Sequence, residues 1–384
     1  MHILVAPNAF KNSLGAVKVA EAINKGLHQS KLSCTATCFP IADGGDGTAD
    51  LLIDYLGGQV IYTTVHDPLK RKIRSAFGWV EKNKTAIIEM ASASGLRLLQ
   101  VREYNPLEAT TYGTGELIIE ALNKGATKII LCIGGSATID GGTGILEALG
   151  VKFFDDKGDD LDNLPASLRS LETFDIKGLD KRISGAEIIV LCDVENLLMG
   201  PNGAAAVFGP QKGASDKDVQ LLETGLSNFR DVVLRKTQKD MSIVKHGGAA
   251  GGVAVALHVF LNARLVNGID YFLEVTQFER EIQKADIVIT GEGSLDRQTL
   301  HGKGPFGVAK KAKEYSIPVV GMAGQVPAIP DQSLNEYFDR LISINDDNED
   351  LKAALQNTYL NLEKAAKNLG DLLSLSSVQN LSGK

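Results

Sequence analysis

The segment "PIADGGDGT" (40–48) places two carboxylates and three glycines within five consecutive positions. Glycine permits tight turns and brings backbone N–H groups close to a ligand, and carboxylates are the oxygen ligands that hard cations prefer. The segment is therefore either a tight surface turn or a loop that binds a ligand and a cation. By itself it leaves both interpretations open.

Four glycine-rich loops of this kind occur along the chain, at 43–48, 134–144, 209–215 and 291–305. Each follows or lies near an apolar run, and ligands of open α/β sheets bind outside the carboxyl ends of strands. The segments "DGGDGTADLL" and "DGGTGILEAL" also place D-G-G-x-G before an amphipathic helix, whose first N–H groups bind anions. Four such loops favour a phosphate site over four simple turns.

The common nucleotide-binding signatures are absent. The chain has no G-x-x-x-x-G-K-[ST] loop, no G-x-G-x-x-G fingerprint and no protein-kinase HRD and DFG set. Phosphoryl transfer nevertheless needs only backbone donors and lysines around phosphate, carboxylates for Mg²⁺, and a group that orients or deprotonates the attacking hydroxyl. The glycine-rich loops contain all of these residue types.

Lys212 and Lys303 are flanked by glycine or proline, which holds them near the backbone of their loops. The carboxylates in or beside the loops are Asp43, Asp46, Asp140, Asp193, Glu292 and Asp296. Any one of them is explained equally well as a turn cap. Asp193 is favoured for chemistry because it directly ends the buried run "IIVLC". Ser136 is expected to bind phosphate, since no histidine is positioned to make it a nucleophile.

Short apolar runs alternate with helical patterns, which is typical of an α/β protein with parallel strands covered on both faces. The expected strands are 2–6, 34–41, 85–90, 128–133, 187–192, 286–290 and 317–322. Residues 60–79 instead indicate an antiparallel pair around Asp67-Pro68, and a helix capped by Ser13 is expected to run to Leu27. An amphipathic helix is expected near 350–373, and a frayed tail over 374–384.

A chain of 384 residues exceeds one usual hydrophobic core, so two domains are expected. The first would be a flavodoxin-like α/β domain with a parallel sheet, discontinuous in sequence, over 1–62 and 284–384. The second, over 63–283, would be an inserted α/β domain with a mixed sheet.

Composition and charge argue against several classes of protein. The formal charge of −7 gives no basic footprint for nucleic acid, and no apolar stretch reaches the length of a membrane span. The start "MHILVAPNAF" has no basic segment before its apolar run, so it is expected to be a buried strand and not a signal peptide. We therefore expect a cytoplasmic protein. Its four cysteines form no disulfide framework, and its six histidines form no metal pattern.

Taken together, the loops resemble the type I glycerate kinase family in segments that follow one another along almost the whole chain. These are "APNAFKNSL" (6–14), "PIADGGDGT" (40–48), "IIEMASASGL" (87–96), "NPLEATTYGTGELI" (105–118), "IGGSATIDGGTGILEALG" (133–150), "CDVENLLMGPNGAAAVFGPQKGA" (192–214), "GGAAGGVAVAL" (247–257) and "ITGEGSLDRQTLHGKGPFGVAKKAK" (289–313). Eight segments in family order are far more specific than any single loop.

The resemblance implies ATP- and Mg²⁺-dependent phosphorylation of D-glycerate, usually at the 2-hydroxyl, and two α/β domains with the active site in the cleft between them. The chain departs from the family at Asn8, where Asp is usual, at Ala9, where Ser is usual, and at Ile139, where Asn is usual. An amide at position 8 can bind hydroxyls of the sugar acid but cannot act as a base.

The residues then take roles from their chemistry. Asp193 is the candidate base, and Asp43 with Glu292 or Asp296 would hold Mg²⁺. Three lysines would neutralise phosphate oxygens or the glycerate carboxylate: Lys11, Lys212 and Lys303. Lys212 is counted among the catalytic residues, and Asn8 and Lys11 among the residues that bind the substrate. Arg71 matches a carboxylate bidentately, although a solvated turn arginine explains it as well. The phosphate-binding set is Gly134, Gly135, Ser136, Thr138, Gly291, Gly293 and Lys303.

Two other functions stay open at this point: a kinase for another small hydroxy acid or sugar acid, and a regulatory module that binds phosphometabolites or nucleotides without chemistry. Six loop carboxylates would weaken phosphate binding in a pure binder, which favours the kinase. The partners expected are small molecules, not nucleic acid or membrane, and the oligomeric state is left open.

Overall fold

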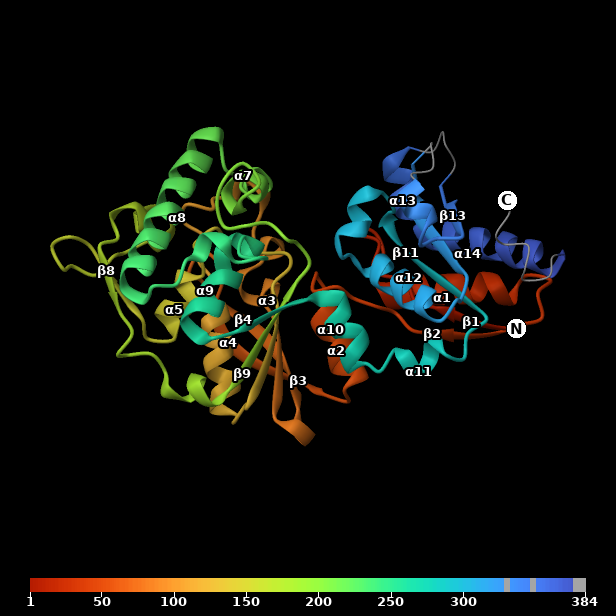
Figure 1. Ribbon diagram of the computed structural model, residues 1–384, viewed down its shortest axis with the longest axis horizontal. Coiled ribbons are helices and arrows are strands. Elements are labelled where there is room, and N and C mark those ends of the chain that lie inside the picture. Colours follow the sequence, from red (N-terminus) through yellow and green to blue (C-terminus); the bar gives the residue numbers. More distant parts are fainter. Residues whose placement is uncertain (328–331, 346–349, 376–384) are drawn as a thin grey trace. The chain divides into compact units, whose positions relative to one another are not determined.

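The computed structural model describes residues 1–327, 332–345 and 350–375, without the side chains of Gln298 and His301. The chain forms two compact units (Figure 1). Unit 1 contains residues 1–43 and 269–384, and unit 2 contains residues 44–268. The chain passes from one unit to the other after Asp43 and again after Gly268. These divisions fall before the boundaries expected from the sequence, 62/63 and 283/284.

Unit 1 is built on a five-stranded sheet in which every neighbouring pair is parallel. The strands are β1 (His2–Val5), β2 (Thr35–Cys38), β11 (Ile287–Ser294), β12 (Val319–Gln325) and β13 (Arg340–Ser343). They lie in the order β2-β1-β11-β12-β13, which is the flavodoxin-like order 2-1-3-4-5 when the strands are counted along the chain. The predicted flavodoxin-like fold with a parallel sheet is confirmed. The order reverses between β1 and β11.

Helices cover both faces of this sheet (Figure 1). They are α1 (Ala16–His28), α10 (Gly268–Val275), α11 (Glu279–Ile282), α12 (Gly304–Glu314), α13 (Gln332–Asn335) and α14 (Leu351–Leu375). The helices α1 and α14 share a core with the alternate strand residues Ile3 and Val5, whereas α12 packs on β11. Helix α1 begins after Gly15, so the expected cap at Ser13 is wrong. The Ser13 hydroxyl donates instead to Leu355 O in α14, at 2.6 Å. Beyond Leu375 the expected frayed tail lies outside the described residues.

Unit 2 is built on a six-stranded mixed sheet in the order β10-β9-β6-β5-β4-β3. The strands are β3 (Gln59–His66), β4 (Lys72–Val80), β5 (Thr85–Glu89), β6 (Lys128–Cys132), β9 (Glu187–Cys192) and β10 (Arg264–Asn267). The pairs β3–β4 and β4–β5 are antiparallel and the rest are parallel. The predicted mixed sheet is therefore confirmed. A small sheet pairs β7 (Lys152–Phe154) with β8 (Thr173–Asp175).

Helices again lie on both sides of the sheet of unit 2 (Figure 1). They are α2 (Thr48–Tyr55), α3 (Ala91–Ser94), α4 (Tyr112–Asn123), α5 (Thr143–Ala148), α6 (Leu164–Ser167), α7 (Ala204–Phe208), α8 (Asp216–Thr237) and α9 (Val253–Leu261). Helix α2 packs on β4 and β5. A Cβ on Gly78 of β4 would lie 2.2 Å from Ile53 of α2, so only glycine allows this approach. The boundary expected from the sequence placed residues 48–55 in the first domain (1–62), whereas the structure places α2 in unit 2.

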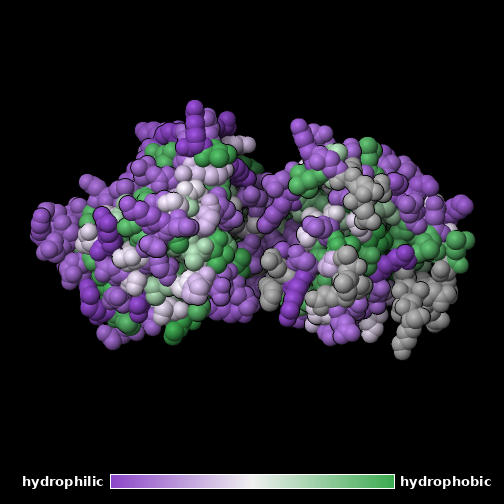
Figure 2. Space-filling view, turned by 90° about the horizontal axis from the view of Figure 1, so that it is seen from above, coloured by the Kyte–Doolittle hydropathy of each residue, from purple (hydrophilic) through white to green (hydrophobic). Residues whose placement is uncertain are grey.

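Figure 2 shows a surface on which hydrophilic residues predominate and hydrophobic ones lie in scattered groups. Within the described residues, no helix combines the length and the apolar character that crossing a membrane requires.

Candidate functional site

In unit 1, predicted site residues gather at the carboxyl ends of β1 and β11, where the strand order reverses. This is the position at which open α/β sheets bind ligands. Asn8, just beyond β1, is bound to β11 because its N–H donates to Gly291 O at 2.8 Å. The buried amide of Asn8 donates to Asp43 Oδ2 at 3.0 Å, and its Oδ1 accepts the N–H of Ala9 at 2.8 Å. Both ends of the Asn8 amide are therefore fixed.

The carboxylate of Asp43 lies against the N-terminus of α12. Its Oδ2 also accepts the N–H of Gly304, the first residue of that helix, at 3.2 Å, where a negative charge is stabilised by the helix dipole. A Cβ on Gly304 would lie 2.8 Å from Asn8 Nδ2, so the close arrangement depends on glycine. Among the described residues, the hydrogen bonds to Asp43 all end on Oδ2.

Glu292 is buried near Asp43, and its environment works against its charge. Burial chiefly, and then the charge of Asp43, raise the pKa of Glu292 to about 7, while Lys303 and Lys11 oppose the rise. Lys303 Nζ lies 3.8 Å from Glu292 Oε1, which also accepts from Thr299 Oγ1 at 3.4 Å. Two neighbouring carboxylates with two lysines suit a cation that binds together with an anion.

A metal ion would have few protein ligands here. Among the described residues, no group of three or more His, Cys, Asp or Glu side chains could hold a metal. Mg²⁺ commonly uses only one or two carboxylates, with water and phosphate oxygens as its other ligands, so the pair Asp43 and Glu292 fits it. Asp296 directly precedes the short 3₁₀ turn Arg297–His301. Its N–H donates to Thr299 Oγ1 at 3.1 Å and its carboxylate accepts from Ser294 Oγ at 3.3 Å.

The two predicted phosphate-binding glycines of β11 differ. A Cβ on Gly291 would lie 1.8 Å from Met322 O, so packing against β12 alone explains this glycine. At Gly293 the nearest atom to a Cβ would be the backbone nitrogen of Lys11, at 3.8 Å, so packing does not demand glycine there.

In unit 2, the predicted residues gather at the carboxyl ends of β6 and β9, which are parallel neighbours. The loop 133–142 follows β6, and Asp193 directly follows β9. The segment 44–47 packs against this loop: Gly134 donates its N–H to Gly44 O at 3.1 Å. Gly135 has a φ of +70°, and a Cβ there would lie 2.2 Å from Asp46 Oδ1. The glycines therefore bring two of the predicted loops together, backbone to backbone.

Lys212 reaches the same loop from inside unit 2. Its side chain is only 3% exposed, and Nζ donates to Ser136 Oγ and to Thr138 O, both at 2.8 Å. Burial lowers the pKa of Lys212 to about 7, and Asp140 opposes this shift. The hydroxyl oxygen of Thr138 is buried and has no hydrogen-bond partner among the described residues. Lys212 thus contacts the predicted phosphate loop and not the solvent.

The two helices that follow the D-G-G-x-G segments each begin at a buried carboxylate. At α5, Asp140 Oδ1 accepts the N–H of Gly142 at 2.9 Å, while Oδ2 accepts from Gly144 N, Thr111 N and Thr111 Oγ1. At α2, Glu89 Oε2 accepts the N–H groups of Gly47 and Ala49 at 3.0 and 3.3 Å. Protein carboxylates therefore already accept these four N–H groups, which makes them unavailable to phosphate.

Arg71 lies in the turn between β3 and β4. Leu69 of that turn packs in one small apolar cluster with Ala137, which places the turn beside the loop that follows β6. The Arg71 guanidinium is bound to Asp67 at 2.5 Å and to Glu103 at 2.7 Å, and both carboxylates raise its pKa.

Glu89 and its partner Arg97, 3.2 Å away, were not among the predicted site residues. The signal that selected Asp193, an acid at the end of a buried strand, is also present in "TAIIEM". Burial raises the pKa of Glu89, and Arg97 opposes the rise.

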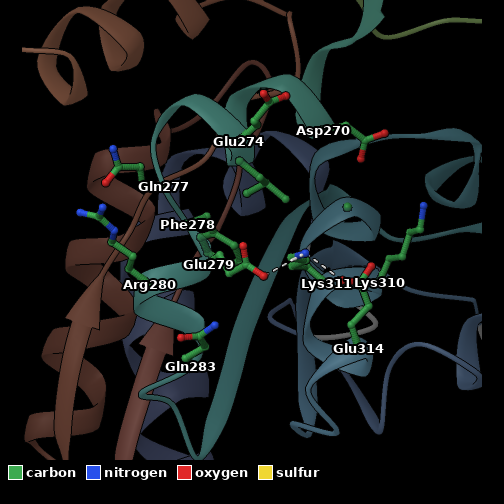
Figure 3. A pocket seen from close by; sticks show the side chains of 12 residues that line it. Asp270, Glu274, Gln277, Phe278, Glu279, Arg280, Gln283, Lys310, Lys311 and Glu314 are labelled. Atoms are coloured by element: carbon green, nitrogen blue, oxygen red, sulfur yellow. Dashed lines mark hydrogen bonds and ion pairs between the residues drawn. The ribbon is translucent and has the colours of Figure 1, made fainter.

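A pocket of about 520 Å³ lies elsewhere in unit 1, among α10, α11 and α12 (Figure 3). Glu279 points toward Lys311 in Figure 3, and Lys311 pairs with both Glu279 and Glu314, at 3.5 and 2.8 Å. None of the predicted site residues lines this pocket. Acidic and basic side chains are mixed along its lining, so it offers no field of a single sign for a phosphate.

Comparison with known proteins gives a consistent result. Residues 3–374 match the model of the glycerate kinase family. The chain is 42% identical to a glycerate kinase of Bacillus subtilis over 99% of this chain and 100% of the relative. It is 41% identical to a glycerate 2-kinase of Escherichia coli over 98% of each. A solved structure from Salmonella typhimurium LT2, assigned as glycerate kinase 2, aligns with a TM-score of 0.82 at 40% identity over 98% of both chains. The chain belongs to the glycerate kinase family.

Proposed function

We propose that the protein is a glycerate kinase, a phosphotransferase that moves the γ-phosphoryl group of ATP to a hydroxyl of D-glycerate. The observation that carries this proposal is identity near 40% along almost the whole chain to relatives with that name. The name of the Escherichia coli relative, glycerate 2-kinase, supports 2-phosphoglycerate as the product.

In unit 1, Asp43 and Glu292 are proposed to hold Mg²⁺, with Asp296 as the alternative to Glu292. When bound, this ion would neutralise charge on the phosphate oxygens during transfer. The charge of Asp43, which raises the pKa of Glu292, supports the pair, because a bound cation would compensate this repulsion. Lys11 and Lys303 are proposed to attract the anionic groups, Gly293 to bind nucleotide phosphate, and Asn8 to bind glycerate through its fixed amide. Gly291, predicted with Gly293, has a structural reason of its own.

In unit 2, Asp193 is proposed as the base that takes the proton of the glycerate hydroxyl. Its place at the end of β9, beside the loop after β6, supports this role. The loop residues proposed to bind phosphate are Gly134, Gly135, Ser136 and Thr138. Lys212 contacts this loop from the interior of unit 2.

Arg71 is proposed to bind the carboxylate of glycerate. To do so it would exchange its ion pair with Glu103 for one with the glycerate carboxylate. Glu103 is the more exposed of its two partners, because its side chain is 25% exposed and that of Asp67 is 2% exposed. The guanidinium would then keep its buried partner and bind the substrate with its other edge.

Purified protein given ATP, Mg²⁺ and D-glycerate should release ADP, and coupling to enolase should then consume the product, because enolase uses 2-phosphoglycerate. L-Glycerate serves as the matched control. A product that enolase accepts only after phosphoglycerate mutase would move the reaction to the 3-hydroxyl. Absence of turnover across a panel of small hydroxy acids would overturn the kinase and favour the phosphometabolite-binding module.

A further inference from the structure

Lys212 is a buried positive charge that has no carboxylate partner in unit 2. It ends the 3₁₀ turn Pro210–Lys212, and the next residue, Gly213, has a φ of +95°. A Cβ on Gly213 would lie 2.4 Å from Tyr104 O, so the backbone is held where the lysine side chain turns inward. Among the described residues, Lys212 forms no ion pair within the 4.0 Å limit of such pairs.

Burying an ammonium is costly unless an anion compensates it. The charge that acts on Lys212 is that of Asp140. This carboxylate already accepts four hydrogen bonds, from Thr111 (two), Gly142 and Gly144. Asp140 thus accepts its hydrogen bonds from other donors and acts on Lys212 only through its charge. This charge does not offset the larger effect of burial, so a bound anion would add to the compensation of Lys212.

The direction of the hydrogen bonds shows how Lys212 can act without touching that anion. An ammonium has donors and no acceptor, so Ser136 Oγ must accept the hydrogen bond from Lys212. The hydroxyl proton of Ser136 therefore points to another acceptor, and none is described among the residues of the structure. The N–H groups of Gly135 and Ser136 likewise have no hydrogen-bond partner among the described residues.

We propose that Lys212 is a positioning residue for a phosphate group of the nucleotide: it holds the 134–138 loop from inside and fixes the Ser136 hydroxyl as a donor toward that group. The inference rests on the proposed kinase function, which supplies a nucleotide. It changes the role expected of Lys212, from a direct ligand of phosphate to a group that acts through Ser136. The field of a buried charge is screened little by solvent, so contact is not required.

Because the pKa of Lys212 is about 7 in the protein without a bound anion, the charge on this lysine changes near neutral pH. A bound anion favours the ammonium, so the contribution of Lys212 to anion binding is full below pH 7 and is lost as the pH rises above it. The groups that face its ammonium are the neutral Ser136 and Thr138 and, at longer range, Asp140.

The test uses ADP as the probe and calorimetry of the full chain without glycerate, for Ser136→Ala, Lys212→Met and the double variant. Each single change is expected to weaken ADP binding about tenfold or more, and the double variant no further than Lys212→Met alone, since the two groups act as one unit. The exposed Lys217→Met serves as the control and should bind like the wild type. Losses that multiply in the double variant, or unchanged affinity in Lys212→Met, would overturn the proposal.

A pH series from 6 to 8.5 separates positioning from a structural role. The ratio of ADP affinity between wild type and Lys212→Met should fall as the pH rises, because only the wild type loses the charge of Lys212. The titration of the ADP phosphates affects both proteins equally and cancels in the ratio. A constant ratio would mean that the lysine only supports the fold. If Lys212→Met does not fold, Lys212→Arg, which keeps the charge, should retain more ADP affinity than Lys212→Gln, and equal losses would overturn the proposal.

Turnover of D-glycerate is measured separately on the wild type. If ADP binds as expected and D-glycerate is not phosphorylated, the proposed substrate fails while the positioning role of Lys212 stands.

Discussion

Carboxylates at glycine-rich loops of this chain meet different partners, and the partner decides what each can do. Asp140 is surrounded by four donors and serves α5. Asp43 shares one oxygen between Asn8 and Gly304, and Glu292 is buried beside it with a raised pKa. A residue type in a loop therefore does not reveal its role until the donors around it are known.

Glu292 should make the stability of the protein depend on pH. Its folded pKa, about 7, lies above the ordinary 4.5, so its contribution to stability is greatest at low pH and is lost as the pH rises through 7. Without divalent cations, Glu292→Gln should become more stable than the wild type between pH 5 and 8, by about 2–3 kcal/mol at most. Urea denaturation at both pH values measures this, with the exposed Glu336→Gln as control. A difference that does not change with pH would contradict the buried, strained carboxylate.

Asp43→Asn should raise the Mg²⁺ concentration needed for half-maximal activity. The fold should survive, because the Asn carbonyl can still accept from Asn8 and Gly304. Titration of activity against Mg²⁺ measures the effect, with the exposed Asp54→Asn as control. An unchanged Mg²⁺ requirement would remove Asp43 from the proposed metal ligands.

Asp193→Asn should lower kcat by about 10²–10⁴ while ADP affinity changes little, as expected when a general base is removed. Steady-state kinetics and calorimetry measure the two quantities. Turnover close to that of the wild type would exclude Asp193 as the base.

At the scale of the element, apolar runs predicted the strands well, because buried parallel strands carry a continuous signal along the sequence. The strand 187–192 matches β9 and the hairpin 60–79 matches β3 and β4. The caps of the helices were not predictable in the same way. Glu89 reaches the start of α2 from a strand 40 residues further along the chain, and no local pattern records that contact. Similarly, Lys212 in the segment "GPQKG" has the sequence pattern of an exposed loop residue, although the structure buries it.

Asp140→Asn tests the cap of α5. An amide cannot accept at both of its ends, so at least one of the four buried donors loses its partner, and an ionised acceptor is lost. The free energy of unfolding should fall by about 2–4 kcal/mol, measured by urea denaturation. The exposed Asp156→Asn should stay within about 0.5 kcal/mol of the wild type. A similarly small effect at Asp140 would mean that the cap contributes little.

At the scale of the whole molecule, unit 2 is one continuous segment and unit 1 is two. A fragment of residues 44–268 should therefore fold alone and unfold cooperatively. The matched fragment 63–283 follows the boundary that the sequence suggested. It lacks α2, which packs on β4 and β5, so it should be less stable and more prone to aggregate. Circular dichroism during thermal unfolding compares the two, and equal behaviour would show that α2 is dispensable to unit 2.

The interleaving of the units also sets an order of events on the ribosome. Strand β1 is made first, yet its neighbour β11 begins at Ile287 and is made only after all of unit 2. At roughly 5–20 residues per second, β1 waits for β11 for roughly ten seconds to a minute. Until then one edge of β1 is unpaired and open to wrong partners. Folding of unit 2 during this wait keeps its own apolar surface out of reach of that edge. Substitutions that slow the folding of unit 2 should therefore lower the yield of folded protein even where they leave its final stability unchanged.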